Sequence, residues 1–194
     1  MSGARALMPW LGALLISVPG HAATIDRLDV TRGNGSQFTL HMRARLDTRA
    51  AEAHRVLSDI AQLPRLNHAI ESAEEIPSPT AHARRARTRV RMCVWRFCAR
   101  LNQVQDIIEL PTKDGYALQA TVIPELSNLR NGTAEWSLRD CGTQTCLHFE
   151  AQLTPDFWIP PLIGTRAVQS VLSRHAILTA EGIERLANTP PRAP

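Results

Sequence analysis

The chain has little that would tie it to nucleic acid or anchor it in a membrane. Lys113 is the only lysine among its 22 basic residues, and the formal net charge of the 194 residues is +4. This charge is modest, and so strong a preference for arginine over lysine is typical of a GC-rich genome more than of a nucleic-acid partner, so we expect no nucleic-acid partner. The apolar run at residues 7–18 is about 12 residues long, whereas a membrane-spanning helix needs about 20.

The sequence also lacks the short motifs of the common catalytic sites. It contains no H-E-x-x-H zinc site, no G-x-S-x-G nucleophile turn and no phosphate-binding loop. We therefore predict no catalytic residue, no metal site and no cofactor. An enzyme whose groups converge only in the fold stays open. His175, on the apolar side of the predicted C-terminal helix, is the first residue to check, although a histidine there is more often part of the core.

The N-terminus has the pattern of a secretory signal peptide. Arg5 is the only charged residue before Asp26, the apolar run follows it, and the small residues Gly20 and Ala22 suit a cleavage site. We expect cleavage after residue 22 and a periplasmic or secreted product.

Removing 22 of the 194 residues leaves 172, which is the size of one ordinary domain. We place this domain at residues 23–188 and expect a disordered tail at residues 189–194. An apolar content of 44% is enough to build a hydrophobic core.

The domain is predicted to be α+β, with strands first and one long helix last. Apolar and polar side chains alternate over residues 38–46, as in a strand with one buried face. The expected strands span residues 25–30, 38–46, 70–76, 85–94, 101–110, 116–123, 134–138 and 147–153, and a longer loop spans residues 124–132.

The helices are predicted from apolar residues that recur with a period near 3.6. Asp47 or Thr48 would cap a helix that runs to about Ile60, and a second short helix would begin at Pro64. The long helix would run from about Gly164 to Ala187. We expect a curved antiparallel sheet of about seven strands wrapped around this helix, because only it is large enough to cover the apolar face of the sheet.

Four cysteines form two C-x4-C pairs, each placed where one strand ends and the next begins. A four-residue hairpin loop puts the flanking cysteines opposite each other, at Cα separations of about 4.5–5.5 Å that suit a disulfide. In an oxidising compartment we therefore predict the local disulfides Cys93–Cys98 and Cys141–Cys146. Zinc ligation and free buried thiols are the weaker alternatives.

Four segments carry a resemblance to a known superfamily. They are Val56-Leu57-Ser58-Asp59, Leu63-Pro64-Arg65-Leu66-Asn67, Gly132-Thr133-Ala134-Glu135-Trp136, and residues 155–164 with the sequence PDFWIPPLIG. With the order of elements, they resemble the START/birch-allergen-like (SRPBCC) superfamily, and within it polyketide-cyclase-like and coenzyme-Q-binding-like proteins. The resemblance covers roughly Phe38 to Ala187. It implies a helix-grip fold and a cavity between helix and sheet that often binds a lipid, sterol, quinone or polyketide.

These observations predict a periplasmic binding or carrier protein for a hydrophobic small molecule or lipid, such as a quinone, a lipid or a polyketide-like compound. The alternatives are a cyclase- or hydrolase-like enzyme on an aromatic or polyketide-like substrate, and an interaction module of the cell envelope. The residues expected to line the ligand pocket are Leu57, Met92, Trp136, Phe149, Phe157, Trp158, Leu162, Val168, Leu172 and His175.

Two aromatic pairs have two interpretations each. Phe157 and Trp158 either plug the core beside a stiff connection or form the mouth of the pocket, since tryptophan suits a boundary between apolar and wet surroundings. Trp95 and Phe97, at the tip of a hairpin, either pack onto the domain or contact a ligand, partner or membrane.

Alternate arginines mark the polar face of the strand at residues 85–94. Arg85, Arg87, Arg89 and Arg91 share this face, and His41, Arg43 and Arg45 could extend it. The simple interpretation is a solvated outer face with cross-strand partners such as Glu135 or Glu150. The alternative is peripheral contact with an anionic membrane surface, worth about 1 kcal/mol per charge.

Overall fold

The computed structural model describes residues 22–94, 96–157 and 163–189. The predicted signal peptide and most of the predicted tail lie outside these residues. No helix within these ranges is long and apolar enough to cross a membrane.

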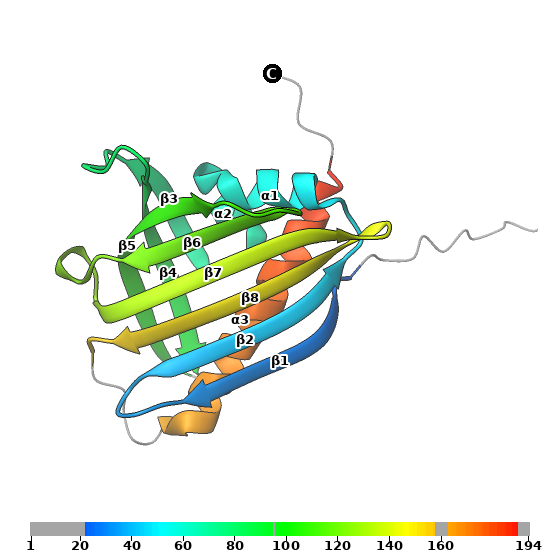
Figure 1. Cartoon of the computed structure of the whole chain (residues 1–194). Helices are drawn as coiled ribbons and strands as arrows, with labels where there is room; N and C mark the ends of the chain where they lie inside the picture. The colour runs from blue at the N-terminus through cyan, green and yellow to red at the C-terminus, as the bar shows by residue number, and fades with distance from the viewer. Residues whose placement is uncertain (1–21, 95, 158–162, 190–194) are drawn as a thin grey trace, which may run out of the picture.

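One antiparallel sheet of eight strands forms most of the domain, with one strand for each of the eight predicted ranges, although a sheet of about seven was expected (Figure 1). The strand order is β1-β2-β8-β7-β6-β5-β4-β3, so every neighbour in the sheet is a neighbour in the chain except the pair β2 and β8. The strands are β1 (Thr24–Arg32), β2 (Phe38–Leu46), β3 (Ile70–Ile76), β4 (Arg84–Val94), β5 (Phe97–Leu110), β6 (Tyr116–Val122), β7 (Leu129–Cys141) and β8 (Gln144–Pro155).

One long helix lies across the inner face of the sheet (Figure 1). It is α3 (Gly164–Ala187), with the bounds that the sequence predicts. The shorter helices α1 (Ala50–Ser58), η1 (Ile60–Gln62) and α2 (Leu63–Leu66) connect β2 to β3, and α1 and α2 pack against α3. The expected α+β architecture, with a curved sheet around a terminal helix, is confirmed.

The core lies between α3 and the inner face of the sheet. On β2 the inner side chains are almost fully buried and alternate with exposed ones, which confirms the period of two. On α3 the side chains of Leu172, Ala180 and Ile183 are buried against this face. Removing such apolar surface from water is the main term that stabilises the fold.

The loop expected at residues 124–132 is mostly ordered structure. It contains the short helix η2 (Pro124–Leu126), and β7 already begins at Leu129. Gly132 misled the prediction because glycine is typical of turns. In the structure it sits inside β7, where a Cβ atom would lie 2.7 Å from Cγ2 of Val122. Here glycine allows a close approach within the sheet.

The predicted cap of the first helix is wrong. Arg49, not Asp47 or Thr48, occupies the N-cap position of α1, and its side chain caps nothing. Asp140, at the far end of β7, instead accepts a hydrogen bond from the backbone N–H of Ala50 at 3.0 Å. A carboxylate from a distant strand thus satisfies a helix terminus, which the local sequence could not reveal.

Both predicted disulfides are present. Cys93–Cys98 joins β4 to β5 with a Cα separation of 4.0 Å, and Cys141–Cys146 joins β7 to β8 with a separation of 5.7 Å. Between the two hairpin turns the chain runs along three antiparallel strands, β5, β6 and β7, so the bonds lie at opposite ends of the sheet.

The arginines of β4 lie on the outer face, but their predicted partners are wrong. Arg85 makes two hydrogen bonds to Asp106 at 2.7 and 2.8 Å, and these lower the pKa of the Asp106 carboxyl. Arg87 pairs with Glu74. The partners come from β3 and β5 because these strands flank β4, whereas Glu135 and Glu150 lie on β7 and β8.

The extension of this face by His41, Arg43 and Arg45 is wrong as well. These residues lie on β2, which four strands separate from β4. Arg45 pairs there with Asp26 of β1. Glu150 of β8 is nevertheless a cross-strand partner as predicted, because it lies opposite His41 with a contact of 3.3 Å.

Candidate ligand-binding cavity

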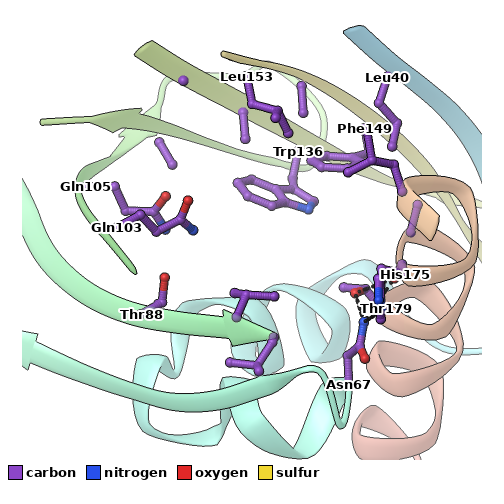
Figure 2. A pocket seen from close by; sticks show the side chains of 18 of the residues that line it. Leu40, Asn67, Thr88, Gln103, Gln105, Trp136, Phe149, Leu153, His175 and Thr179 are labelled. Atoms are coloured by element: carbon purple, nitrogen blue, oxygen red, sulfur yellow. Dashed lines mark hydrogen bonds between the residues drawn. The ribbon is translucent and has the colours of Figure 1, made fainter. Parts of the chain in front are cut away.

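A cavity of about 260 Å³ lies between α3 and the inner face of the sheet. Its wall combines α1, α2 and α3 with strands from β2 to β8, so it has formed where the sheet curves around the helix (Figure 2). Ligand pockets of this kind are concave and mostly apolar.

Three alanines leave room for the cavity. Ala120, Ala134 and Ala151 are directly opposite one another on β6, β7 and β8, and all three line it. Because a methyl group extends so little from the sheet, this row leaves space that larger side chains would fill.

Aromatic rings form one wall beside the alanine row. Trp136 of β7 and Phe149 of β8 are cross-strand partners whose stacked rings have centroids 4.8 Å apart (Figure 2). Both side chains are half-buried, and no side chain of a described residue accepts a hydrogen bond from the Trp136 indole. The rings therefore present a flat apolar surface with one free N–H donor.

The first polar group in the wall joins α2 to α3. Asn67, 5% exposed, follows α2. Its Nδ2 lies 3.1 Å from the backbone oxygen of His175, 3.3 Å from Thr179 Oγ1 and 3.3 Å from His175 Nδ1 (Figure 2). These contacts fix the position of the helical insert on α3.

The same contacts fix the state of the His175 ring. The backbone N–H of Ala69 donates to Asn67 Oδ1 at 3.0 Å, so the other amide atom must be the NH₂ group. An NH₂ group facing His175 Nδ1 requires that nitrogen to be unprotonated, which places the proton of the neutral imidazole on Nε2. Burial lowers the pKa of His175, and the nearby His68 and Arg174 lower it further.

A second polar group lies on the inner face of the neighbouring strands β4 and β5. Thr88, Gln103 and Gln105 all line the cavity. Figure 2 shows the two glutamine side chains next to each other, with the Thr88 hydroxyl directed toward them. None of these three residues is among those predicted for the pocket.

A second hollow of about 400 Å³ adjoins the cavity near the tip of the β4–β5 hairpin. The two share Phe38, Met92, Leu101, Leu153 and Leu172 as lining residues. The outer part is lined by Arg96 and Phe97 of the hairpin and by Ile163 at the start of α3. Phe97 is 50% exposed, so an aromatic side chain reaches solvent at this end of the cavity.

Most residues predicted for the pocket lie at these two hollows. Those on the wall of the cavity are Leu57, Met92, Trp136, Phe149, Leu172 and His175. Phe157 and Val168 line the second hollow, and Trp158 and Leu162 lie outside the described residues, as does Trp95. That these side chains bind a ligand stays a prediction.

Comparison with solved structures identifies the fold. The Zhui aromatase/cyclase from Streptomyces sp. R1128 aligns with a TM-score of 0.62 and 13% identity, over 81% of this chain and 97% of that chain. Human StAR-related lipid transfer protein 5 aligns with a TM-score of 0.63 and 13% identity, over 82% of this chain and 86% of that chain. For a STAR-related lipid transfer protein fragment from Xanthomonas axonopodis the TM-score is 0.54 and the identity 12%, over 82% and 96% of the two chains.

At the level of sequence, no family model and no curated protein matches the chain. The structural likeness, at 12–13% identity, concerns the fold alone. The chain therefore has the helix-grip fold shared by START-type lipid-transfer proteins and aromatase/cyclases.

Proposed function

We propose that this chain is an exported carrier that encloses a hydrophobic small molecule, such as a quinone, a lipid or a polyketide-like compound, between α3 and the sheet. The observation that carries the proposal is the cavity of about 260 Å³, whose wall is mostly aliphatic and aromatic. The lipid-transfer and cyclase proteins that share the fold support a hydrophobic ligand. The signal-peptide pattern and the two disulfides support a periplasmic or secreted location.

The geometry favours binding over proton abstraction by His175. A general base needs a free unprotonated nitrogen that faces its substrate. In His175 the unprotonated nitrogen is Nδ1, and the amide of Asn67 already occupies it. The remaining nitrogen carries a proton and can only donate.

If the carrier collects its ligand from a membrane, the tip of the β4–β5 hairpin is the part that we expect to contact that membrane. Phe97 and Arg96 line the outer hollow, and an exposed aromatic beside a cation suits a lipid interface. The paired arginines of β4 offer no comparable surface, because acidic side chains flank them.

The proposal is tested by filling the cavity. Ala134→Phe places a large side chain in the middle of the alanine row, while Glu135→Phe places the same side chain on the outer face of β7 as a control. The mature protein should release a hydrophobic compound on organic extraction or show a bound mass by native mass spectrometry. Ala134→Phe should lose at least nine-tenths of it, and Glu135→Phe should keep it.

Two results would count against the proposal. One is a mature protein that copurifies with no compound and binds neither lipids nor quinones when they are added. The other is an Ala134→Phe variant that folds and binds as much compound as the wild type, because the ligand would then lie elsewhere.

A further inference from the structure

The inner face of β5 departs from the apolar pattern of the other strands. Leu101, Gln103, Gln105 and Ile107 face the cavity in succession, so two primary amides stand where the alternation calls for apolar residues. The pairing of β4 with β5 puts Thr88 opposite Gln103 and Ala86 opposite Gln105. The small Ala86 leaves the second amide unobstructed from that side.

The hydrogen-bonding capacity of this group is unused. Thr88 is 4% exposed, and its hydroxyl has no hydrogen-bond partner in the described part of the chain. The side-chain amides of Gln103 and Gln105 likewise have no partner among the described residues. A buried hydroxyl in a folded protein is almost always paired, and the half-buried amides of Gln103 and Gln105 line the same cavity beside Thr88. Together the three groups point to a partner that enters the cavity.

The charge of the wall limits what that partner is. No aspartate, glutamate, lysine or arginine is among the described residues that line the cavity. His175 is the only titratable side chain there, and its lowered pKa keeps it neutral at neutral pH. A carboxylate or phosphate would be buried without a counter-charge, which is far costlier than burying a neutral group.

We propose that Thr88, Gln103 and Gln105 bind the neutral, oxygen-bearing end of an amphipathic ligand, a hydroxyl or carbonyl group, while its hydrocarbon body lies along Trp136, Phe149 and the alanine row. An amide offers both a donor and an acceptor, so two amides and a hydroxyl can bind either group. The inference rests on the proposed carrier function and adds the polarity of the ligand. It excludes fatty-acid and phospholipid head groups from this end of the cavity.

Three probes of nearly equal size test the proposal: 2-naphthol, 2-methylnaphthalene and 2-naphthoate. They carry a hydroxyl, a methyl and a carboxylate on the same ring system, and calorimetric titration of the delipidated mature protein ranks them. We expect 2-naphthol to bind at least tenfold more tightly than either of the others.

Substitutions at Thr88, Gln103 and Gln105 then test whether these residues cause the preference for 2-naphthol. Gln103→Met with Gln105→Met keeps the length of the side chains and removes the amides, and Thr88→Val removes the hydroxyl. Together they should bring 2-naphthol within about threefold of 2-methylnaphthalene, without weakening 2-methylnaphthalene. Gln119→Met on the outer face of β6 is the matched control and should leave the ranking unchanged.

The outcomes separate this inference from the proposed function. If 2-naphthol and 2-methylnaphthalene bind equally well, or 2-naphthoate binds best, the polar group does not select a neutral head group, although the cavity still binds. If none of the probes binds and no compound copurifies, the carrier function fails together with the inference. The ranking in the wild-type protein decides the matter even where a variant does not fold.

Discussion

At the scale of single residues, Asn67 and His175 show how a polar pair can serve the fold of a binding protein. The two N–H groups of the Asn67 amide are shared among the imidazole, the backbone oxygen of His175 and Thr179, so they tie the segment after α2 to α3. Protonation of His175 Nδ1 would place an N–H against the NH₂ group of Asn67. The neutral ring is therefore part of the folded structure.

This state makes stability depend on pH. The pKa of His175 in the folded protein lies below its ordinary value of 6.5, so the unfolded chain takes up a proton first as the pH falls. Stability from this group is complete above about pH 6.5 and decreases below it, by at most about 1.4 kcal/mol per pH unit. His175→Gln keeps an acceptor without a titrating group, so its stability should fall less than that of the wild type between about pH 7.5 and pH 5.

Urea unfolding at a series of pH values measures the difference. His82→Gln, in the exposed segment between β3 and β4, is the control and should follow the wild type. Parallel profiles for the wild type and His175→Gln would show that His175 does not contribute to the acid sensitivity.

The sequence predicted which single residues face inward better than it predicted their partners. Trp136 and Phe149 fell on the inner face because alternation along one strand determines the face. The acid partners of Arg85 and Arg87 depend instead on which strands flank β4, and this is a matter of topology.

At the scale of elements, the contact between α2 and α3 depends on a glycine. Gly182 lies within α3, and a Cβ atom there would be 2.1 Å from the backbone oxygen of Leu66 in α2. Backbone cannot give way as a flexible side chain can, so the two helices would have to separate.

Gly182→Ala is therefore expected to destabilise the protein. Alanine in place of glycine normally stabilises a helix interior by about 1 kcal/mol. Here overpacking should reverse the sign and lower the free energy of unfolding by about 1–3 kcal/mol. Ser170→Ala, at an exposed position of the same helix, is the control and should change stability little. A Gly182→Ala variant as stable as the wild type in urea would show that α2 is not held this closely.

Elements with a local pattern were predictable, and those set by distant contacts were not. The helical period of the apolar residues in α3 predicted its bounds, whereas the cap of α1 comes from Asp140, some 90 positions along the chain.

The polar group of Thr88, Gln103 and Gln105 could have been predicted from the sequence. Once Cys93 is paired with Cys98, the register of the hairpin places Thr88 opposite Gln103. The missing step was to follow this register along β5.

At the scale of the whole molecule, charge and hydrogen-bonding capacity are separated. Arginine–carboxylate pairs cover the outer face of the β3–β4–β5 edge, and the cavity behind the same strands has neutral polar groups only among the described residues. These charged pairs keep the outer face hydrated, while the neutral wall of the cavity does not attract anionic ligands into the interior.

The pairing also bears on membranes. Arg85, Arg87 and Arg100 pair with Asp106, Glu74 and Glu71 on the outer face. Strands β3 to β5 carry five acids against six arginines, so little net positive charge remains on this edge of the sheet. We expect the mature protein to stay in solution when vesicles that contain about 30% phosphatidylglycerol are floated near physiological salt, where the screening length is about 8 Å.

Replacing the three acids by amides, as Glu71→Gln, Glu74→Gln and Asp106→Asn together, should release the arginines. At about 1 kcal/mol per charge near an anionic surface, three charges give about 3 kcal/mol, enough for salt-sensitive flotation. Asp114→Asn, Glu125→Gln and Glu135→Gln together change the net charge equally but lie away from β4, so they form the matched control. If the control floats as well as the first variant, net charge rather than the arginine strand decides vesicle binding. If the wild type already floats, the acids do not neutralise this face and the protein acts at the envelope surface.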